Sequence, residues 1–503
     1  MTDASRATLT EFIGKQHEPQ PDLPEKGDRG EGPVPSEAIW LVLATHLRGL
    51  EQAGVVDERS ATLLASALER NVSHREPVSS FRSVAQALEQ RVDAGLPDEL
   101  RGAVTLGLAH EDWSGTAARV MTRSAALSVG DAASQAQRAM LAMAELHAVT
   151  LMQGFHTGRP VQPVTFGHFL GGAIAPVGTG IARLLDAIDR LNRSPLGAGT
   201  MSGEVVGGER SDTAEWLGFS QAMPNTYDAV TNVEDVAGVA EATASIAAPM
   251  ARLLDELVVM VRTDPSSMVF DDAWMRSSDH HLPGFSPAER LTRVAQQLRS
   301  VVSASQAMTS QLRQLPYGPA GAANDWIASQ LVALAGIATD QFGAIDELFR
   351  TSMTVNRAYL ANRAGRDFAT SNDLAAFLMT EEQLPPSVAR DIAGLTLRRL
   401  NEESLEISAI MPDHVDMAAM MVIGRELKVE METLGRWFAP RRFLERRLVE
   451  GSPAPSKTRE WIEKERAVNQ QAIDGIASRR LRIREAEADV RTWITETAAA
   501  GDD

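Results

Sequence analysis

The 503-residue sequence contains no cysteine. Without thiols the chain cannot form disulfides, thiolate metal sites, iron–sulfur clusters or a cysteine nucleophile. It also lacks an apolar run of about 18 residues, so we expect no transmembrane helix. The first residues, MTDASRATLTEF, contain no basic region followed by an apolar run, and this argues against a secretory signal peptide. These absences predict a soluble, cytoplasmic protein.

Aromatic residues and positive charge are also scarce. Phe, Trp and Tyr make up 5% of the chain, and 49 Lys and Arg face 67 Asp and Glu, a net charge of −18. This balance argues against a broad basic face for nucleic-acid phosphates. The hydrophobic content of 44% excludes a mainly disordered chain. Few aromatics beside abundant Ala and Leu favour helices over sheets.

Long segments carry apolar residues at the spacing i, i+3, i+4 and i+7, which is typical of amphipathic helices. The predicted long helices cover residues 119–153, 164–192, 233–262, 288–313 and 324–360. Thirty helical residues extend about 45 Å and need packing partners along their whole length. Several of these helices are apolar on more than one face, which favours a bundle extended by oligomerisation. A monomeric helical solenoid is the alternative, but no fixed repeat period supports it.

Composition divides the chain into four parts. A mobile arm rich in Pro, Gly and charge is expected first, then an N-terminal helical domain, the central bundle, and a small helical C-terminal domain that includes a charged terminal helix. The expected bounds are 1–35, 36–112, 113–364 and 365–503. Ser36 is the expected N-cap of the first helix. Functional residues are expected in the loops between the long helices.

Common catalytic and cofactor motifs are missing. The sequence has no phosphate-binding loop, zinc-protease motif, serine-hydrolase elbow or EF-hand. The spaced glycines of residues 197–203 follow no predicted strand and indicate a turn. His280 and His281 are adjacent, which is an awkward geometry for two ligands of one metal ion. We therefore expect neither a metal nor a nucleotide cofactor.

Several segments nevertheless resemble one enzyme family. They are RPVQPVTFGHFL (159–170), PLGAGTMSGEVVGGERSDTAEWLGF (195–219), NTYDAVTNVEDV (225–236), SSMTVNRAYL (351–360) and ERRLVEGSPAP (445–455). In this order they resemble argininosuccinate lyase of the aspartase/fumarase superfamily, and the resemblance covers roughly residues 36–480.

The resemblance implies an all-α protein with three helical domains and a central bundle of five long helices. In this family four subunits form a twenty-helix core, and each active site takes residues from three of them. The family reaction removes a proton beside a carboxylate and then expels the group on the neighbouring carbon, usually releasing fumarate. A small-molecule substrate, a homotetramer and no cofactor are the expectations that follow.

The family's catalytic serine lies in a loop that corresponds here to residues 276–286. Ser278 matches the serine regarded as the base, and Ser277 precedes it as a substrate-binding candidate. The Lys and Asn that follow the serine in the family are missing from this chain. A serine hydroxyl is not basic at neutral pH and needs a neighbouring group to activate it. The loss of Lys and Asn removes groups expected to help in this activation.

A second family motif corresponds to residues 154–163, where the usual Thr-His pair is transposed. His156 is the candidate for acid catalysis at the leaving group, and Thr157 and Gln162 are substrate-binding candidates. A histidine that only makes structural hydrogen bonds in this loop is the alternative.

Four of the remaining candidates lie in segments that match the family less closely, and the fifth, Arg210, lies in the matching segment 195–219. His110 and Ser114 match the first family motif. The Arg, Asn and Asp of that motif are replaced here by Gly, Thr and Ala, and Trp113 is a larger side chain within the same segment. Tyr317 keeps its place without the arginine that follows it in the family, and Arg210 is retained. All five are substrate-binding candidates.

The scaffold therefore resembles the family while the expected pocket has lost cations. Our principal hypothesis is a lyase that cleaves a C–N bond by β-elimination from a substrate other than argininosuccinate, with secondary metabolism as one setting. Two alternatives stay open. One is another proton-transfer enzyme, a cyclase or an isomerase, and the other is a catalytically silent scaffold or binding protein.

Overall fold

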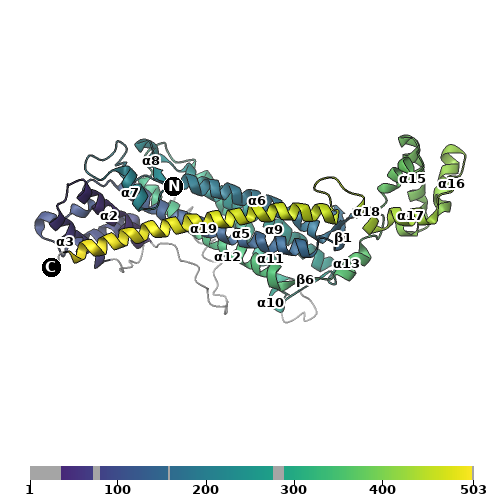
Figure 1. Ribbon diagram of the computed structural model, residues 1–503, viewed down its shortest axis with the longest axis horizontal. Coiled ribbons are helices and arrows are strands. Elements are labelled where there is room, and N and C mark those ends of the chain that lie inside the picture. The colour runs from purple at the N-terminus through teal and green to yellow at the C-terminus, as the bar shows by residue number, and fades with distance from the viewer. Residues whose placement is uncertain (1–34, 72–79, 157–158, 276–287, 501–503) are drawn as a thin grey trace.

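The computed structural model describes residues 35–71, 80–156, 159–275 and 288–500, and the expected N-terminal arm lies almost entirely outside this part. The described chain is an elongated helical molecule whose long helices run along one axis (Figure 1). No helix in these ranges has the length and apolarity needed to cross a membrane.

Five long helices form the central bundle, as the sequence predicts. They are α5 (His110–Leu146), α6 (Phe166–Leu191), α9 (Glu234–Thr263), α11 (Glu289–Leu312) and α12 (Gly321–Glu347). The largest difference lies at the end of the last predicted run. There α12 ends at Glu347, followed by a π-helical turn (Leu348–Ser352), strand β6 (Met353–Val355) and α13 (Arg357–Arg363).

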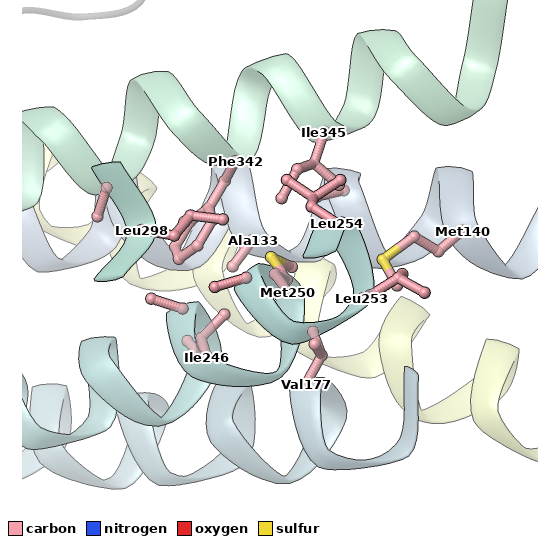
Figure 2. Close-up of a cluster of buried hydrophobic side chains, with 14 of the residues drawn as sticks. Ala133, Met140, Val177, Ile246, Met250, Leu253, Leu254, Leu298, Phe342 and Ile345 are labelled. Atoms are coloured by element: carbon pink, nitrogen blue, oxygen red, sulfur yellow. The ribbon is translucent and has the colours of Figure 1, made fainter. Parts of the chain in front are cut away.

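The bundle core consists of aliphatic and Met side chains together with a few large aromatics. In Figure 2, Met250 of α9 lies among side chains of neighbouring helices that include Val177 and Phe342. Glycines allow the close contacts: a Cβ at Gly180 of α6 would lie 2.7 Å from Ile246 Cγ1. Each large apolar side chain buried here contributes about 1.5–3 kcal/mol, which explains why the long helices associate.

A second apolar core lies at one end of the bundle. It is built by α2 (Pro35–Gln52), α3 (Glu58–Glu69), α4 (Phe81–Asp93) and the first turns of α5. Because α2 begins at Pro35, Ser36 lies in its first turn and is not the N-cap. Asp57 caps α3 by accepting a hydrogen bond from the Ser60 backbone N–H. Two 3-10 turns, Asp98–Leu100 and Ala103–Thr105, lead into α5.

A small helical unit extends from the other end of the bundle (Figure 1). It comprises α14 (Asp373–Thr380), α15 (Pro386–Glu402), a 3-10 turn (Ile407–Ala409), α16 (Pro412–Ile423), α17 (Met431–Phe438) and α18 (Pro440–Glu445), and has its own apolar core. Asp373 anchors the end of this unit by accepting hydrogen bonds from Arg446 and Arg447.

The terminal helix α19 (Pro455–Ala499) leaves this unit and runs back along the bundle (Figure 1). Its 45 residues extend about 68 Å. Ile462 and Ile476 enter the bundle core, while Val490 and Ile494 enter the core around α2 and α3. Residues 455–499 therefore pack with the bundle and the N-terminal helices, although the sequence suggested that they belong with the C-terminal domain.

Short strands and helices connect the long elements. Strands β1 (Leu151–His156) and β2 (Arg159–Thr165) form an antiparallel hairpin, β3 (Arg193–Ser194) pairs in parallel with β4 (Gln221–Ala222), and β5 (Met268–Phe270) pairs with β6. The short helices are α7 (Arg210–Trp216), α8 (Thr226–Thr231) and α10 (Asp272–Met275).

Candidate active site

The first turns of α5 carry three of the predicted site residues, His110, Trp113 and Ser114, within an arc of about 100° around the helix. A helix turns about 100° per residue, so the side chains of Trp113 and Ser114 diverge. Ser114 is buried, and Asn324 Nδ2 of α12 donates a hydrogen bond of 3.0 Å to its Oγ. Trp113 is half-buried against the N-terminal core and meets the His110 ring edge to face at 4.9 Å. Ser114 therefore faces α12, and Trp113 supports the helix.

His110 occupies the first position of α5. Burial lowers the pKa of its imidazole, and the charge of Arg82 lowers it further. Its Nδ1 is buried without a hydrogen-bond partner in the described part of the chain. A lowered pKa favours the neutral imidazole, in which one ring nitrogen carries the proton and the other presents a lone pair.

A narrow polar pocket lies where the starts of α5, α9 and α12 meet α8. Its lining includes Glu111, Gly115, Arg119, Asn232 and Asn324. The pocket has a volume of about 20 Å³, room for roughly one water molecule. A Cβ at Gly115 would lie 3.4 Å from Asn324 Nδ2. A methyl group at this position would therefore make an ordinary van der Waals contact with Asn324.

Arg119 is the cation in the lining of this pocket, and it is already paired. Its two terminal nitrogens each lie 3.1 Å from Asp235 Oδ2, and Nη1 also donates to the carbonyl oxygen of Leu191 at 3.0 Å. Arg193 Nη2 approaches the same carboxylate oxygen at 2.9 Å. Burial lowers the pKa of Arg119, and the charge of Asp235 opposes this shift. The guanidinium is thus committed to the fold.

Behind the first turn of α5 lies a buried carboxyl group that the sequence analysis missed. Asp112 is fully buried, and its Oδ2 accepts a hydrogen bond of 2.9 Å from the Gly199 N–H. Its Oδ1 has no partner within the described ranges. Burial raises the pKa of Asp112 well above its usual range, and burial also raises the pKa of nearby Glu204. Acidic residues are common in the first turn of a helix, so the position of Asp112 in the sequence does not indicate that its side chain is buried.

Arg210 begins α7 and binds backbone within its own chain. Its Nε donates to the Leu196 carbonyl at 2.9 Å, and Nη1 donates to the Met223 carbonyl at 2.9 Å. Nη2 lies 3.5 Å from the Pro195 carbonyl. These contacts hold the loop between α6 and α8 in place, and they use the donors that a substrate carboxylate would need.

Tyr317 stands just before α12 and stacks on Tyr227 of α8. The ring centroids lie 5.8 Å apart, the planes differ by 15°, and Tyr317 is 84% exposed. Close by, the Ala320 N–H donates to the Val230 carbonyl at 2.7 Å, and both of these residues line the pocket. The stacked tyrosines therefore form an aromatic surface beside the pocket.

The second predicted motif lies beyond the other end of α5. His156 is the last residue of β1, is exposed and pairs with Arg159 of β2. Gln162 lies opposite Gly154 and lines a groove of about 360 Å³ beside residues 447–453. Thr157, Ser277 and Ser278 lie outside the described residues.

The two groups of candidates are therefore far apart in one chain. Helix α5 has 37 residues, and its part from Ser114 to its last residue, Leu146, extends about 48 Å towards the hairpin. A single protomer does not bring His156 to the pocket beside Ser114.

Comparisons with known proteins agree with this architecture. The lyase family model matches residues 47–274. The argininosuccinate lyase of Methanocorpusculum labreanum is 24% identical over 475 residues, covering 92% of this chain and 93% of that protein. The argininosuccinate lyase of Methanoculleus marisnigri is 27% identical over 440 residues, covering 86% and 87%.

Solved structures show the same fold at lower identity. EDDS lyase in complex with formate superposes with a TM-score of 0.81 at 19% identity, covering 94% of each chain. A class II fumarase from Schistosoma mansoni gives a TM-score of 0.64 at 12% identity, covering 86% of this chain and 94% of that one. The matched lyase family model and these relatives support an argininosuccinate-lyase-like member of the aspartase/fumarase superfamily, a lyase of the C–N type.

Proposed function

We propose that this lyase cleaves the C–N bond of an N-substituted amino acid other than argininosuccinate, and that it releases an unsaturated carboxylate such as fumarate. A base removes the proton beside a carboxylate, and the electron pair left on carbon then expels the amine. Developing negative charge on the carboxylate has to be stabilised by donors, and the departing nitrogen has to receive a proton. The proposal on the substrate rests on the pocket at the start of α5.

The lining of that pocket supports a less anionic substrate. Gly115 supplies no side-chain donor, and Arg119 is bound to Asp235. Arg210, the other cation among the predicted residues described here, is bound to backbone carbonyls. Burying a carboxylate without a partner costs several kcal/mol, so each missing cation disfavours a substrate with many carboxylates.

The aromatic surface beside the pocket supports an amine part that differs from the guanidinium-bearing amino acid. Tyr227 and Tyr317 present stacked rings, and Tyr317 is largely exposed. Stacked tyrosine rings favour aromatic or extended apolar groups, with the phenol oxygens available for hydrogen bonds. We propose that the substituent on the substrate nitrogen packs against this surface.

Ser278 is the proposed base, and His156 is the proposed acid at the leaving group. The length of α5 keeps His156 away from Ser114 within one protomer. We therefore propose a homotetramer in which neighbouring chains complete each site. Since a closed assembly repeats the same contacts, every pocket at the start of α5 would receive the same partner residues.

The substrate proposal is tested with purified protein and a panel of N-substituted aspartates that includes argininosuccinate, adenylosuccinate and EDDS. We expect fumarate absorbance with at least one substrate whose amine part is aromatic or apolar, and little with argininosuccinate. Efficient turnover of argininosuccinate would overturn the substrate proposal. No fumarate from any compound would overturn the fumarate-releasing version, and would favour a cyclase, an isomerase or a silent scaffold.

The residue roles are tested by a matched pair of variants. Ser278→Ala is expected to abolish turnover of the substrate found, whereas Ser277→Ala is expected to raise KM with a smaller effect on kcat. Full activity of Ser278→Ala would exclude the serine as the base. Equal loss in both variants would point to the loop as a whole.

Shared sites predict complementation between two inactive variants. Ser278→Ala and His156→Gln, unfolded and refolded together, would form some sites with both native residues. If those two residues come from different chains, random mixing would restore about a quarter of the native activity. The matched control is each variant refolded alone. Absence of recovery in tetramers shown to be mixed would contradict the shared site.

A further inference from the structure

The methionines of this chain are divided sharply between a buried and an exposed set. The sequence has 19 Met and no Cys, so thioethers are its only sulfur groups. All exposed methionines of the described chain lie in the small helical unit, where one of them, Met411, is the N-cap of α16. They are Met379, Met411, Met417, Met420, Met421 and Met431. Their side chains are 37–72% exposed.

The other described methionines are buried or half-buried. Those of the bundle core, among them Met140, Met250 and Met260, are at most 7% exposed. Met250 lies in the densely packed cluster of Figure 2. Met201 and Met275 are half-buried. The exposed thioethers are thus concentrated in the unit that extends beyond the bundle, away from the start of α5 (Figure 1).

Helix α16 presents three of these thioethers side by side. Met417, Met420 and Met421 follow the i, i+3, i+4 spacing that places side chains on one helix face. The opposite face packs into the core of the unit through Val415, Ala418 and Ala419. A buried side of small residues therefore holds the helix while the methionines point outward. We call Met417, Met420 and Met421 the methionine face.

An arginine lies against this face. Arg399 Nη1 of α15 lies 2.8 Å from Met417 Sδ, while Arg399 Nε donates to Glu403 Oε1 at 2.8 Å. Thioether sulfur is a weak acceptor, whereas the oxygen of a sulfoxide is a strong one. A sulfoxide at Met417 would gain a charge-assisted hydrogen bond from a guanidinium that is already in place.

We propose that the methionine face is a reversible oxidation site that consumes two-electron oxidants of the peroxide and hypochlorous acid class before they reach the bundle core. With hydrogen peroxide the sulfur lone pair attacks an oxygen, the O–O bond breaks, and that oxygen is transferred to sulfur; with hypochlorous acid the lone pair attacks chlorine, the O–Cl bond breaks, and water then displaces chloride from sulfur and supplies the oxygen. The thioether is oxidised to a sulfoxide, and the oxidant is reduced to water from hydrogen peroxide or to chloride and a proton from hypochlorous acid. Methionine sulfoxide reductases return the sulfoxide to the thioether.

The position of the face explains why this chemistry would be harmless there and damaging elsewhere. A sulfoxide is polar, and on α16 its oxygen would face solvent or Arg399. The same change at Met250 would place an unpartnered polar group among Val177, Ile246 and Phe342. Such a group costs about 1–3 kcal/mol and would disturb the packing of the long helices.

The experiment adds limiting hypochlorous acid, from one to six equivalents per chain, to the full-length protein and maps sulfoxides by peptide mass spectrometry. We expect sulfoxide at the methionine face to exceed that at Met140 and Met250 by at least about tenfold. The thermal unfolding midpoint is expected to stay unchanged over this range. Treatment with methionine sulfoxide reductases and a thiol reductant is expected to remove the added mass.

A variant carrying Met417→Leu, Met420→Leu and Met421→Leu tests the protective role. Leucine has a similar volume, so the variant is expected to fold with an unchanged midpoint. At the same dose of oxidant it is expected to show at least about twofold more sulfoxide in the core and a lower midpoint than the native chain. The matched control is Met250→Leu, which removes one buried thioether and keeps the face.

Two results would overturn the proposal: sulfoxides spread evenly over exposed and buried methionines, or equal core oxidation in the triple variant and the native chain. The role of Arg399 has its own readout. Arg399→Leu is expected to lower the sulfoxide fraction at Met417 relative to Met420 by about twofold. An unchanged ratio would remove Arg399 from the proposal.

Discussion

Removing the carboxylate of Asp235 is expected to destabilise the fold strongly. Asp235 is 7% exposed and accepts hydrogen bonds from both terminal nitrogens of Arg119 and from Arg193. In Asp235→Ala the buried Arg119 would keep only the carbonyl oxygen of Leu191 at 3.0 Å and Asn232 Oδ1 at 3.4 Å. Leaving a buried charge without its partner typically costs about 3–5 kcal/mol. We expect a loss of this size in the free energy of unfolding.

The measurement is urea unfolding followed by far-UV circular dichroism, and the same helix provides the control. Asp255 of α9 pairs with Arg299 at 2.6 Å, but these side chains are 51% and 47% exposed. Exposed ion pairs contribute about 0–1 kcal/mol, so Asp255→Ala is expected to change the free energy of unfolding by no more than this. Asp235→Asn, which keeps one acceptor oxygen, is expected to fall between the two. Equal losses in Asp235→Ala and Asp255→Ala would refute the reasoning from burial.

Two glycines of α6 are expected to respond oppositely to alanine. A Cβ at Gly167 would lie 2.2 Å from a backbone carbonyl of α5, whereas Gly172 has open space. Gly167→Ala is expected to cost about 1–3 kcal/mol and Gly172→Ala to gain up to about 1 kcal/mol, and matching thermal midpoints would contradict this. Burial, followed by the charge of Arg357, lowers the pKa of His147 from 6.5 to about 4. The unfolded chain then binds a proton at His147 more tightly than the folded chain does. The contribution of His147 to the free energy of unfolding is therefore fully present above about pH 6.5 and is lost as the pH falls towards 4. His147→Gln is expected to flatten this part of the curve of unfolding free energy against pH, and an unchanged slope would assign it to other groups.

The long helices could be predicted because their pattern is local and repeated. The end of the last predicted run could not, because strand β6 pairs with β5, more than 80 residues earlier in the chain. The course of α19 was hidden for a related reason. Eight of its 45 residues are buried, and two of these, Thr458 and Asn469, are polar. So sparse a stripe resembles a solvated helix until its partner helices are known.

The sequence predicted which residue types lie near the candidate site better than it predicted where their side chains point. The sequence marked Ser114 and Trp113 together, but one helix position separates a side chain that meets Asn324 from one that packs on the N-terminal core. Arg210 matches the family motif. However, its guanidinium donates to backbone carbonyls of residues up to 15 positions away in the chain. Such pairings depend on how the loops fold, and a motif does not record them.

The rigid length of α5 links the fold to the proposed chemistry. Ser114 lies about 48 Å from the end of this helix, and His156 follows ten residues after that end. Ten fully extended residues span at most about 36 Å, so bending of the hairpin cannot close the gap. If both residues act on one substrate, the second must come from another chain. The same helices that are apolar on several faces would then have two roles, because the packing that stabilises the assembly would also bring the halves of each site together.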